Sequence, residues 1–285
     1  GNNVTVSDLG CLTVNVLGPS GATIGGLRGD GDVAPQYQLS NSNSRTITIS
    51  PASDSHAFDG RIRNGASGSV LSVVKSGSGT QIFGTDSTGS YTGTTTVSAG
   101  KLVINGNFSA ATGAVSVGAD GTLGGTGIIG GATTVSGTLA AGNSTGLLTF
   151  NSTLALAGGA AFEIHGTARG AAVGGYDAVD VGGALTYGGT LTALFGTSFG
   201  AGSYNFDLFD FDGQSGTLDS LGIAGSYSGT LNPDNGWALT SGTESWGFNH
   251  STGVLSLTVV PEPGVALLGG LGLVALLRRR RRDWA

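Results

Sequence analysis

Residues 74–104 read VKSGSGTQIFGTDSTGSYTGTTTVSAGKLVI. Short runs of β-branched and aliphatic residues, such as 94–97 (TTTV) and 101–104 (KLVI), alternate here with glycine and serine. Such runs are too short for helices, and β-branched residues favour extended backbone. Glycine between them permits sharp corners because it adopts positive φ without a steric penalty. The stretch predicts short strands joined by tight corners.

The same unit recurs along the chain, for example at 114–117 (AVSV), 133–135 (TTV) and 154–156 (LAL). A sandwich or a barrel would also use short strands, but strong hairpin turns such as Asn-Gly are scarce here. A β-helix stacks each strand on the next coil at a spacing of about 4.8 Å and encloses a narrow aliphatic core. We therefore expect an all-β parallel solenoid, with about eleven coils of roughly 20 to 25 residues.

Residues 74–84 followed by 91–102 resemble the autotransporter-associated β-strand repeat. The sequence departs from that repeat at Gln81 and Phe83, where the repeat has leucine. Flanking segments between about residues 20 and 190 resemble further coils of autotransporter passenger domains. The resemblance implies a right-handed parallel β-helix. It implies no enzymatic activity, because the repeat is a scaffold shared by adhesins, proteases and structural proteins.

Aromatic residues concentrate between 191 and 258. Residues 204–212 (YNFDLFDFD) alternate apolar and polar side chains, which predicts a half-buried strand, and 246–257 predicts a closing hairpin. A solenoid needs a cover over its open end. We interpret 1–190 as the β-helix, 191–258 as a C-terminal β cap and 259–285 as a separate tail.

The tail contains three parts in order: Pro261, Glu262 and Pro263; an apolar run over 264–277; and the cluster Arg278, Arg279, Arg280, Arg281 and Arg282. As a helix the 14 apolar residues would rise about 21 Å, short of the roughly 30 Å of a bilayer core. The run has no polar face, so it is not typical of a helix packed on a globular body. Five arginines at one end would stay cytoplasmic, which places the body outside the inner membrane.

This ordered triplet resembles the PEP-CTERM sorting domain of Gram-negative bacteria. The resemblance implies one short C-terminal transmembrane helix, recognition by a membrane-embedded exosortase, and removal of the tail near Pro261, Glu262 and Pro263. The precursor would be anchored in the inner membrane and the product sent to the cell surface or an extracellular polysaccharide matrix. The chain begins at Gly1, which fits either a cleaved signal peptide or a fragment of a longer chain.

Composition limits the partners. The chain has 55 glycines and only 11% charged residues. Without the tail the body has 7 basic and 16 acidic residues, a net charge of −9. Nucleic-acid binding needs basic patches, so it is not expected. Cys11 is the single cysteine and cannot form an internal disulfide.

Residues for catalysis are few. His56, His165 and His250 stand alone, without a second histidine or cysteine at metal-ligand spacing. We therefore expect no metal and no cofactor. The acidic residues worth testing are the candidates for paired carboxylates, Asp30 with Asp32 and Asp54 with Asp59, and the candidates for a hard-cation site, Asp207, Asp210, Asp212 and Asp219. The simpler interpretation of the proposed pairs is that these acids are solvated in a loop rich in glycine and serine. For Asp210 and Asp212 it is that both lie on one face of the same strand. The integrin-type tripeptide at 28–30 is short enough to arise by chance.

The sequence thus favours a non-enzymatic exported protein, a β-helical rod that acts in adhesion or in surface-layer or biofilm structure. Its expected partners are exosortase, the inner membrane before processing, and exopolysaccharide or other surface proteins. Two alternatives stay open: a polysaccharide-processing enzyme on the same scaffold, and a carbohydrate-binding protein that uses the aromatic segment. A groove lined by carboxylates about 5 to 9 Å apart would favour the enzyme. An exposed aromatic row near Trp237 and Trp246 would favour sugar binding.

Overall fold

The computed structural model describes residues 3–6, 11–14, 22–35, 44–65, 68–142 and 144–261. The regular structure of these residues is β, apart from one 3₁₀ turn, η1 (Pro233–Asn235). Twenty-seven strands form one hydrogen-bonded sheet in which nearly all pairs are parallel, and four more form a separate antiparallel sheet. The described part of the chain is therefore all-β apart from this turn, as the sequence predicts.

The parallel strands fall into three ladders that the chain visits in turn. The first ladder contains β3 (Ala22–Ile24), β6 (Arg45–Ile49), β9 (Leu71–Lys75), the starts of β12 (Thr95–Ile104) and β14 (Val115–Gly125), β16 (Thr133–Val135), β19 (Leu154–Leu156), and the ends of β23 (Ala178–Tyr187) and β26 (Phe209–Gly216). The second ladder contains β1 (Asn3–Val6), β4 (Gly26–Gly29), β7 (Ser55–Phe58), β10 (Thr80–Phe83), the ends of β12 and β14, β17 (Thr138–Ala141), β20 (Gly159–Ile164), β24 (Thr190–Phe195) and β27 (Ser220–Gly225).

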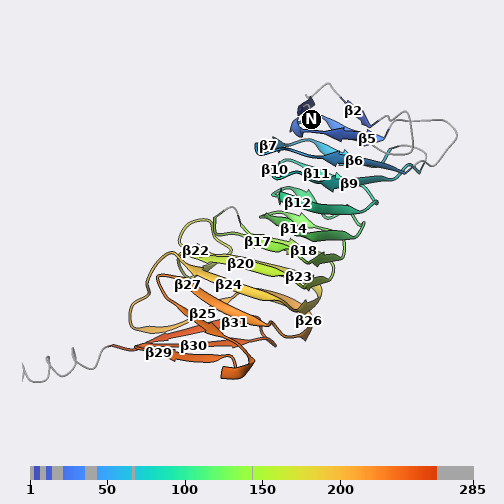
Figure 1. The fold of residues 1–285 in the computed structure, drawn as a ribbon. Coiled ribbons are helices and arrows are strands. Elements are labelled where there is room, and N and C mark those ends of the chain that lie inside the picture. The colour runs from blue at the N-terminus through green and yellow to red at the C-terminus, as the bar shows by residue number, and fades with distance from the viewer. Residues whose placement is uncertain are drawn as a thin grey trace, which may run out of the picture.

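The third ladder contains β2 (Cys11–Val14), β5 (Asp32–Pro35), β8 (Arg61–Arg63), β11 (Thr88–Ser90), β13 (Asn107–Phe108), β15 (Ile128–Ile129), β18 (Leu147–Phe150), and the starts of β23 and β26. One coil therefore contributes one strand to each ladder, and successive coils stack along one axis (Figure 1). This arrangement is consistent with a parallel β-solenoid.

Coil length varies more than the sequence suggests. In the second ladder Thr122 pairs with Thr138, a coil of 16 residues, whereas Gly159 pairs with Thr190, a coil of 31 residues. The strands must stay in register, but the corners between ladders accept insertions. The range is therefore wider than the expected 20 to 25 residues.

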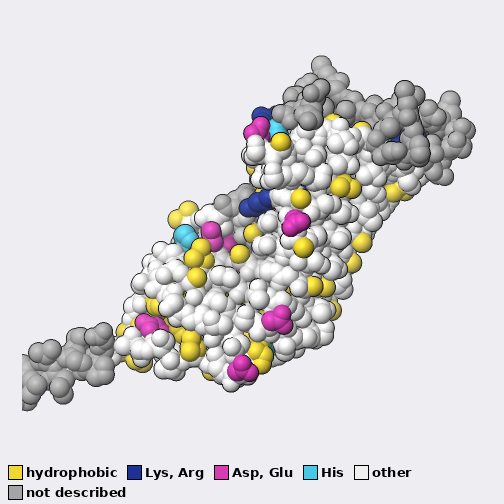
Figure 2. Space-filling model, viewed as in Figure 1, with side chains coloured by type: hydrophobic (Ala, Val, Ile, Leu, Met, Phe, Trp, Pro, Cys, Tyr) yellow, Lys and Arg dark blue, Asp and Glu magenta, His cyan; other side chains and the backbone are white. Residues whose placement is uncertain are grey.

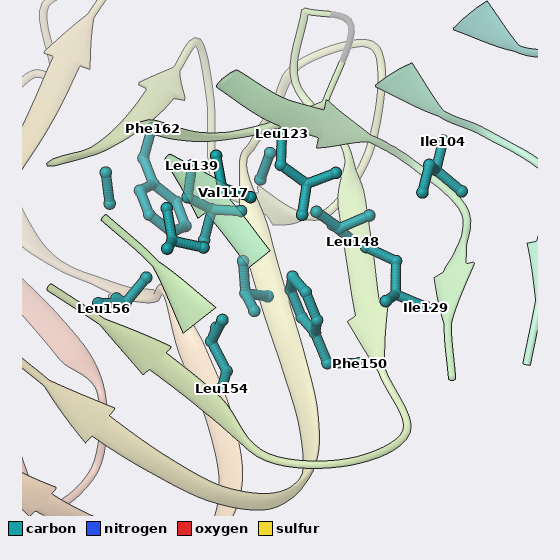
Figure 3. Close-up of a cluster of buried hydrophobic side chains, with 14 of the residues drawn as sticks. Ile104, Val117, Leu123, Ile129, Leu139, Leu148, Phe150, Leu154, Leu156 and Phe162 are labelled. Carbon is teal, nitrogen blue, oxygen red and sulfur yellow. The ribbon is translucent and has the colours of Figure 1, made fainter. Parts of the chain in front are cut away.

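Charged side chains are few on the face of the stack that Figure 2 shows, and one small group of basic, acidic and histidine side chains lies near its N-terminal end. The interior is aliphatic and aromatic, because alternate residues of each strand point inward. In the second ladder Leu102, Leu123 and Leu139 occupy successive inward positions and are fully buried. Figure 3 shows Leu123 and Leu139 in one buried cluster with Leu148 of the third ladder and Val117 of the first. The narrow core is thus built from all three ladders.

Corners between ladders depend on glycine and on Lys75. Gly100 has φ 65°, and a Cβ there would lie 2.3 Å from the carbonyl oxygen of Gly77 in the coil before. Lys75 occupies an inward position between Ile49 and Val97 and is fully buried. Its Nζ donates to the carbonyl oxygens of Ser76 (2.8 Å), Gly77 (2.9 Å) and Ala99 (3.0 Å). Burial lowers the pKa of Lys75 to about 8 because desolvation disfavours its charged form.

Gln81, where the sequence differs from the repeat that it resembles, has a structural role. Gln81 pairs with His56 in the second ladder and points into the core, where Leu102 follows it. Its Oε1 accepts from the N–H of Leu27 (2.9 Å), and its Nε2 donates to the carbonyl oxygens of Leu27 (3.0 Å) and His56 (3.2 Å). The buried amide therefore stabilises backbone that the regular ladder leaves unpaired.

The longest coil contains an excursion between β20 and β23, with β21 (Ala168–Arg169) and β22 (Gly175–Tyr176). Asp177 anchors its end: the carboxyl accepts from the N–H groups of Gly146 (2.8 Å) and Glu163 (2.7 Å). Burial raises the pKa of Asp177 to about 7. A side chain with a raised pKa thus serves here to fix a loop.

The antiparallel sheet has the order β25 (Gly202–Asp207), β31 (Val254–Val259), β30 (Glu244–Asn249) and β29 (Ala238–Ser241). The predicted hairpin at 246–257 is confirmed as β30 and β31. The sheet packs against the C-terminal end of the stack (Figure 1), where Phe195 lies 5.6 Å from Phe206 and 5.1 Å from Trp246 between ring centroids. A short strand, β28 (Gly229–Leu231), pairs antiparallel with β27.

The alternating run at 204–212 forms two strands rather than the single one expected. The chain changes sheets at the buried residue Leu208: β25 joins the antiparallel sheet, and β26 returns to the parallel stack. The N–H of Leu208 donates to the carbonyl oxygen of Gly253 (3.0 Å). Parallel pairing continues through β24, β26 and β27, so the boundary expected at residue 190 falls inside the stack.

Within the described ranges, no helix is long and apolar enough to cross a bilayer. The transmembrane helix expected at 264–277 lies outside the described residues.

Candidate functional site

The outer face of the antiparallel sheet carries small and polar residues around a glycine. Asn205 pairs with Ser256, and Ser256 pairs with Gly247, so these three positions form a row across the sheet. The alternate row, Phe206 and Leu255, is fully buried against the stack. The missing side chain at Gly247 leaves the centre of the outer face low.

A cleft of about 420 Å³ lies at this low point. We call it the Trp237 cleft; the residues that line it are Asn205, Trp237, Gly247, Phe248, Asn249, Thr252, Val254 and Ser256. None of them is charged. A Cβ on Gly247 would lie 2.9 Å from Ser256 Oγ. A Cβ at residue 247 would therefore displace the Ser256 hydroxyl and take up space on the floor of the cleft. The walls of the cleft combine aromatic rings with amides and hydroxyls.

Trp237 has an unusual backbone. Its φ is 61°, and within the described ranges it is the only residue other than glycine with positive φ. For a bulky residue this is a genuine outlier, with a cost on the order of 1–3 kcal/mol. Hydrogen bonds on both sides hold it: its N–H donates to Asn232 O (3.1 Å), and its carbonyl accepts from Phe248 N–H (3.0 Å). A strained turn therefore places this ring at the cleft.

His250 supports the ring of Trp237. Their ring centroids are 4.4 Å apart at an interplanar angle of 78°, and Phe248 lies 4.8 Å from His250. His250 Nε2 accepts from the N–H of Leu218 (3.2 Å), and desolvation lowers the pKa of His250. The imidazole of His250 is thus packed between the rings of Trp237 and Phe248 and supports the position of Trp237.

A second hollow lies on the third ladder. This acidic groove, about 230 Å³, is lined by residues of β18, β23 and β26, including Thr149, Asp180, Asp210 and Asp212. Thr149, Asp180 and Asp210 are in register on neighbouring strands, which lie about 4.8 Å apart. Sequence reasoning grouped Asp210 and Asp212 but missed Asp180, which arrives through pairing of distant strands.

Arg169 binds the carboxylates beside this groove. Its Nη1 lies 2.8 Å from Asp180 Oδ1, and its Nε lies 3.1 Å from Asp207 Oδ2. Burial raises the pKa of Asp207, and the guanidinium of Arg169 partly opposes that shift. Asp180 and Asp207 therefore anchor the excursion that carries Arg169.

The remaining histidines have separate surroundings. His56 is buried, and its Nδ1 accepts from Arg28 Nε (2.8 Å). His165 is half exposed, and its Nε2 lies 4.0 Å from Glu163 Oε2. Across the described part of the chain, no group of three or more His, Cys, Asp or Glu residues could hold a metal ion.

Neither of these two hollows is lined by Asp30, Asp32, Asp54 or Asp59, the carboxylates proposed as pairs. Asp32 accepts from Arg61 Nε (2.7 Å) and from Arg63 Nε (3.1 Å). The arginine of the 28–30 tripeptide is engaged with His56. Asp219 directly precedes β27, and its N–H donates to Gly189 O (2.6 Å).

The predicted sorting motif lies almost entirely outside the described residues. Pro261 is the last residue described, directly after β31 and Val260, whose N–H donates to Thr243 O (2.9 Å). Glu262, Pro263 and the arginines at 278–282 lie beyond it.

The two tryptophans of the aromatic segment differ. Trp246 is 4% exposed and packs in the core, whereas Trp237 lines the cleft. No aromatic row across both residues is present on the described surface. Sequence reasoning missed Asn205, Asn249 and Ser256, because they meet only through strand pairing.

In the comparisons with known proteins, no family model, no curated protein and no solved structure matches this chain.

Proposed function

We propose that this protein is a non-enzymatic exported protein of the cell surface or extracellular matrix, a right-handed β-helical rod that acts in adhesion or in surface-layer or biofilm structure. The observation that supports this best is the continuous stack from β1 to β27. Backbone hydrogen bonds join each coil to the next, so the stack resists stretching along its axis. Such a body suits a spacer or a structural unit.

The tail supports the export half of the proposal. In it, residues 264–277 hold the precursor in the inner membrane, and exosortase recognises Pro261, Glu262 and Pro263. After processing, the rod reaches the surface, where exopolysaccharide or other surface proteins are its partners. A body charge of −9 argues against nucleic acid as a partner.

Removal of residues 261–285 tests the export proposal. In the native cells the truncated body should be released in soluble form and lose surface retention, because the anchor and motif are gone. Mass spectrometry of the full-length product should find a mature C-terminus near Pro261. Trp284→Ala is the matched control: it leaves the prolines, apolar run and arginines in place and should stay at the surface. Unchanged localisation of the truncated protein would overturn the sorting argument.

The acidic groove favours a second candidate, a polysaccharide-processing enzyme, because Asp180 and Asp210 are neighbours there. The rod proposal expects no release of reducing ends from polysaccharides by the purified protein. If the protein releases reducing ends and Asp210→Asn abolishes that release, the enzyme becomes the better proposal and the non-enzymatic rod is overturned.

A further inference from the structure

We infer that the Trp237 cleft binds a neutral sugar unit of a polysaccharide. A sugar ring presents C–H groups on its faces and hydroxyls around its edge. It is bound by an aromatic surface beside uncharged donors and acceptors. The cleft provides this combination, with Trp237 next to Asn205, Asn249 and Ser256 and no charged residue in its lining. Its volume of about 420 Å³ lies within the roughly 300–1,000 Å³ typical of small-ligand sites.

The amides have capacity for a ligand. Asn205 is exposed, and its side chain makes no hydrogen bond to any described residue. Asn249 Oδ1 accepts from the N–H (2.9 Å) and Oγ (2.7 Å) of Ser251. That turn fixes the Asn249 amide and leaves its Nδ2 as a donor. Sugar hydroxyls can pair with both amides, since each hydroxyl donates and accepts.

The backbone conformation at residue 247 does not require glycine. Gly247 lies inside β30, and its φ is not positive. A glycine within a strand weakens the strand and often marks a close approach of a ligand or another backbone. Here a Cβ would occupy the cleft floor, 2.9 Å from Ser256 Oγ. The glycine therefore keeps space open at the floor of the cleft.

The backbone of Trp237 is an independent observation. Strained residues persist where the surroundings hold them, and they concentrate at binding sites. The turn at 232–237 and the ring of His250 hold Trp237 at one edge of the cleft. The tryptophan ring is thus positioned before a ligand arrives, which reduces the ordering cost of binding.

This inference depends on the proposed surface role in one respect only, the assignment of the sugar to a polysaccharide of the extracellular matrix. A matrix polysaccharide and a free monosaccharide share this chemistry, and we assign the cleft to the polymer. Binding is measured on purified protein and localisation in cells, so either proposal can fail alone.

The test uses the full chain, purified in a zwitterionic detergent without a sugar headgroup. Probes are an array of neutral and acidic oligosaccharides, followed by titration calorimetry with the neutral oligosaccharide that binds best and with glucose, galactose and mannose. We expect neutral oligosaccharides to bind. Trp237→Gly should weaken binding at least tenfold; it removes the ring, while glycine tolerates the positive φ. Gly247→Val should do the same by filling the cleft.

Asn205→Ala provides a variant at an exposed position whose folding should not change, and it should also weaken binding. Gly213→Ala is the control, because a Cβ at Gly213 meets nothing within 4 Å and the residue does not line the cleft. Circular dichroism confirms that each variant keeps its β signal. No binding of any neutral oligosaccharide, or binding unaffected by Trp237→Gly and Asn205→Ala, would overturn the inference. Binding of monosaccharides as tight as that of oligomers would overturn the assignment to the polymer.

Discussion

A single buried ammonium, that of Lys75, joins the corners of two successive coils. It donates to the carbonyl oxygens of Ser76 and Gly77 in its own coil and of Ala99 in the next. No carboxylate accepts from it among the described residues, so carbonyl dipoles alone offset the cost of burying its charge. The lysine that carries the resemblance to the repeat is therefore a corner residue of the fold.

We predict that Lys75→Met lowers the free energy of unfolding by about 1–3 kcal/mol at pH 7, because three buried carbonyls lose their donor. The pKa of Lys75 is about 8 in the fold against 10.5 as its ordinary value. Between these values the unfolded chain binds more protons than the folded one, so Lys75 adds stability as pH rises through this window. The gap between wild type and variant should widen from pH 8 to 10.5 in urea titrations.

Lys101→Met is the control in these urea titrations, because it also removes one lysine charge. A constant gap between wild type and Lys75→Met across the window would contradict the burial of a charged amine at this corner.

At the scale of elements, the C-terminal sheet depends on the point where the chain changes sheets. The N–H groups of Leu208 (3.0 Å) and Phe209 (3.4 Å) both donate to the carbonyl of Gly253. Gly253 has φ 70°, and a Cβ there would lie 2.1 Å from Phe209 O. The junction of β25, β26 and β31 is therefore built around one glycine.

We predict that Gly253→Ala lowers the free energy of unfolding by at least about 2 kcal/mol, since left-handed backbone strain adds to the steric overlap. Hydrogen exchange should rise first in β25, β30 and β31, because each coil of a stack contacts only its neighbours. Gly213→Ala, with open space around its Cβ position, should change stability by no more than about 0.5 kcal/mol. Equal loss of protection in β9 and β12 would contradict local coupling.

At the scale of the whole molecule, strands account for almost all regular structure in the described residues. We predict that residues 1–260, expressed without the tail, give a circular dichroism spectrum dominated by β signal and a cooperative thermal transition. The ladders form one continuous sheet, so the coils should unfold together with their neighbours. A substantial helical signal in this fragment would contradict the fold.

Much of the coil architecture could be predicted from local patterns. Runs such as 133–135 and 154–156 did become strands β16 and β19, because alternation and β-branching act over a few residues. The run at 204–212 misled this reasoning, since a period of two cannot show that the chain changes sheets at Leu208. The variation in coil length could not be predicted for a similar reason, because insertions at the corners leave no periodic signal in the sequence.

The sequence by itself determined that the body is all-β, that glycines separate its short strands, and that it is acidic, because these properties depend on each residue and its near neighbours. Only the tertiary structure decided which side chains meet. Asn205 joins Ser256 and Gly247 through strand register, and Asp180 meets Asp210 in the same way. Register depends on packing between segments far apart in the chain, so the Trp237 cleft exists only once the sheet has formed.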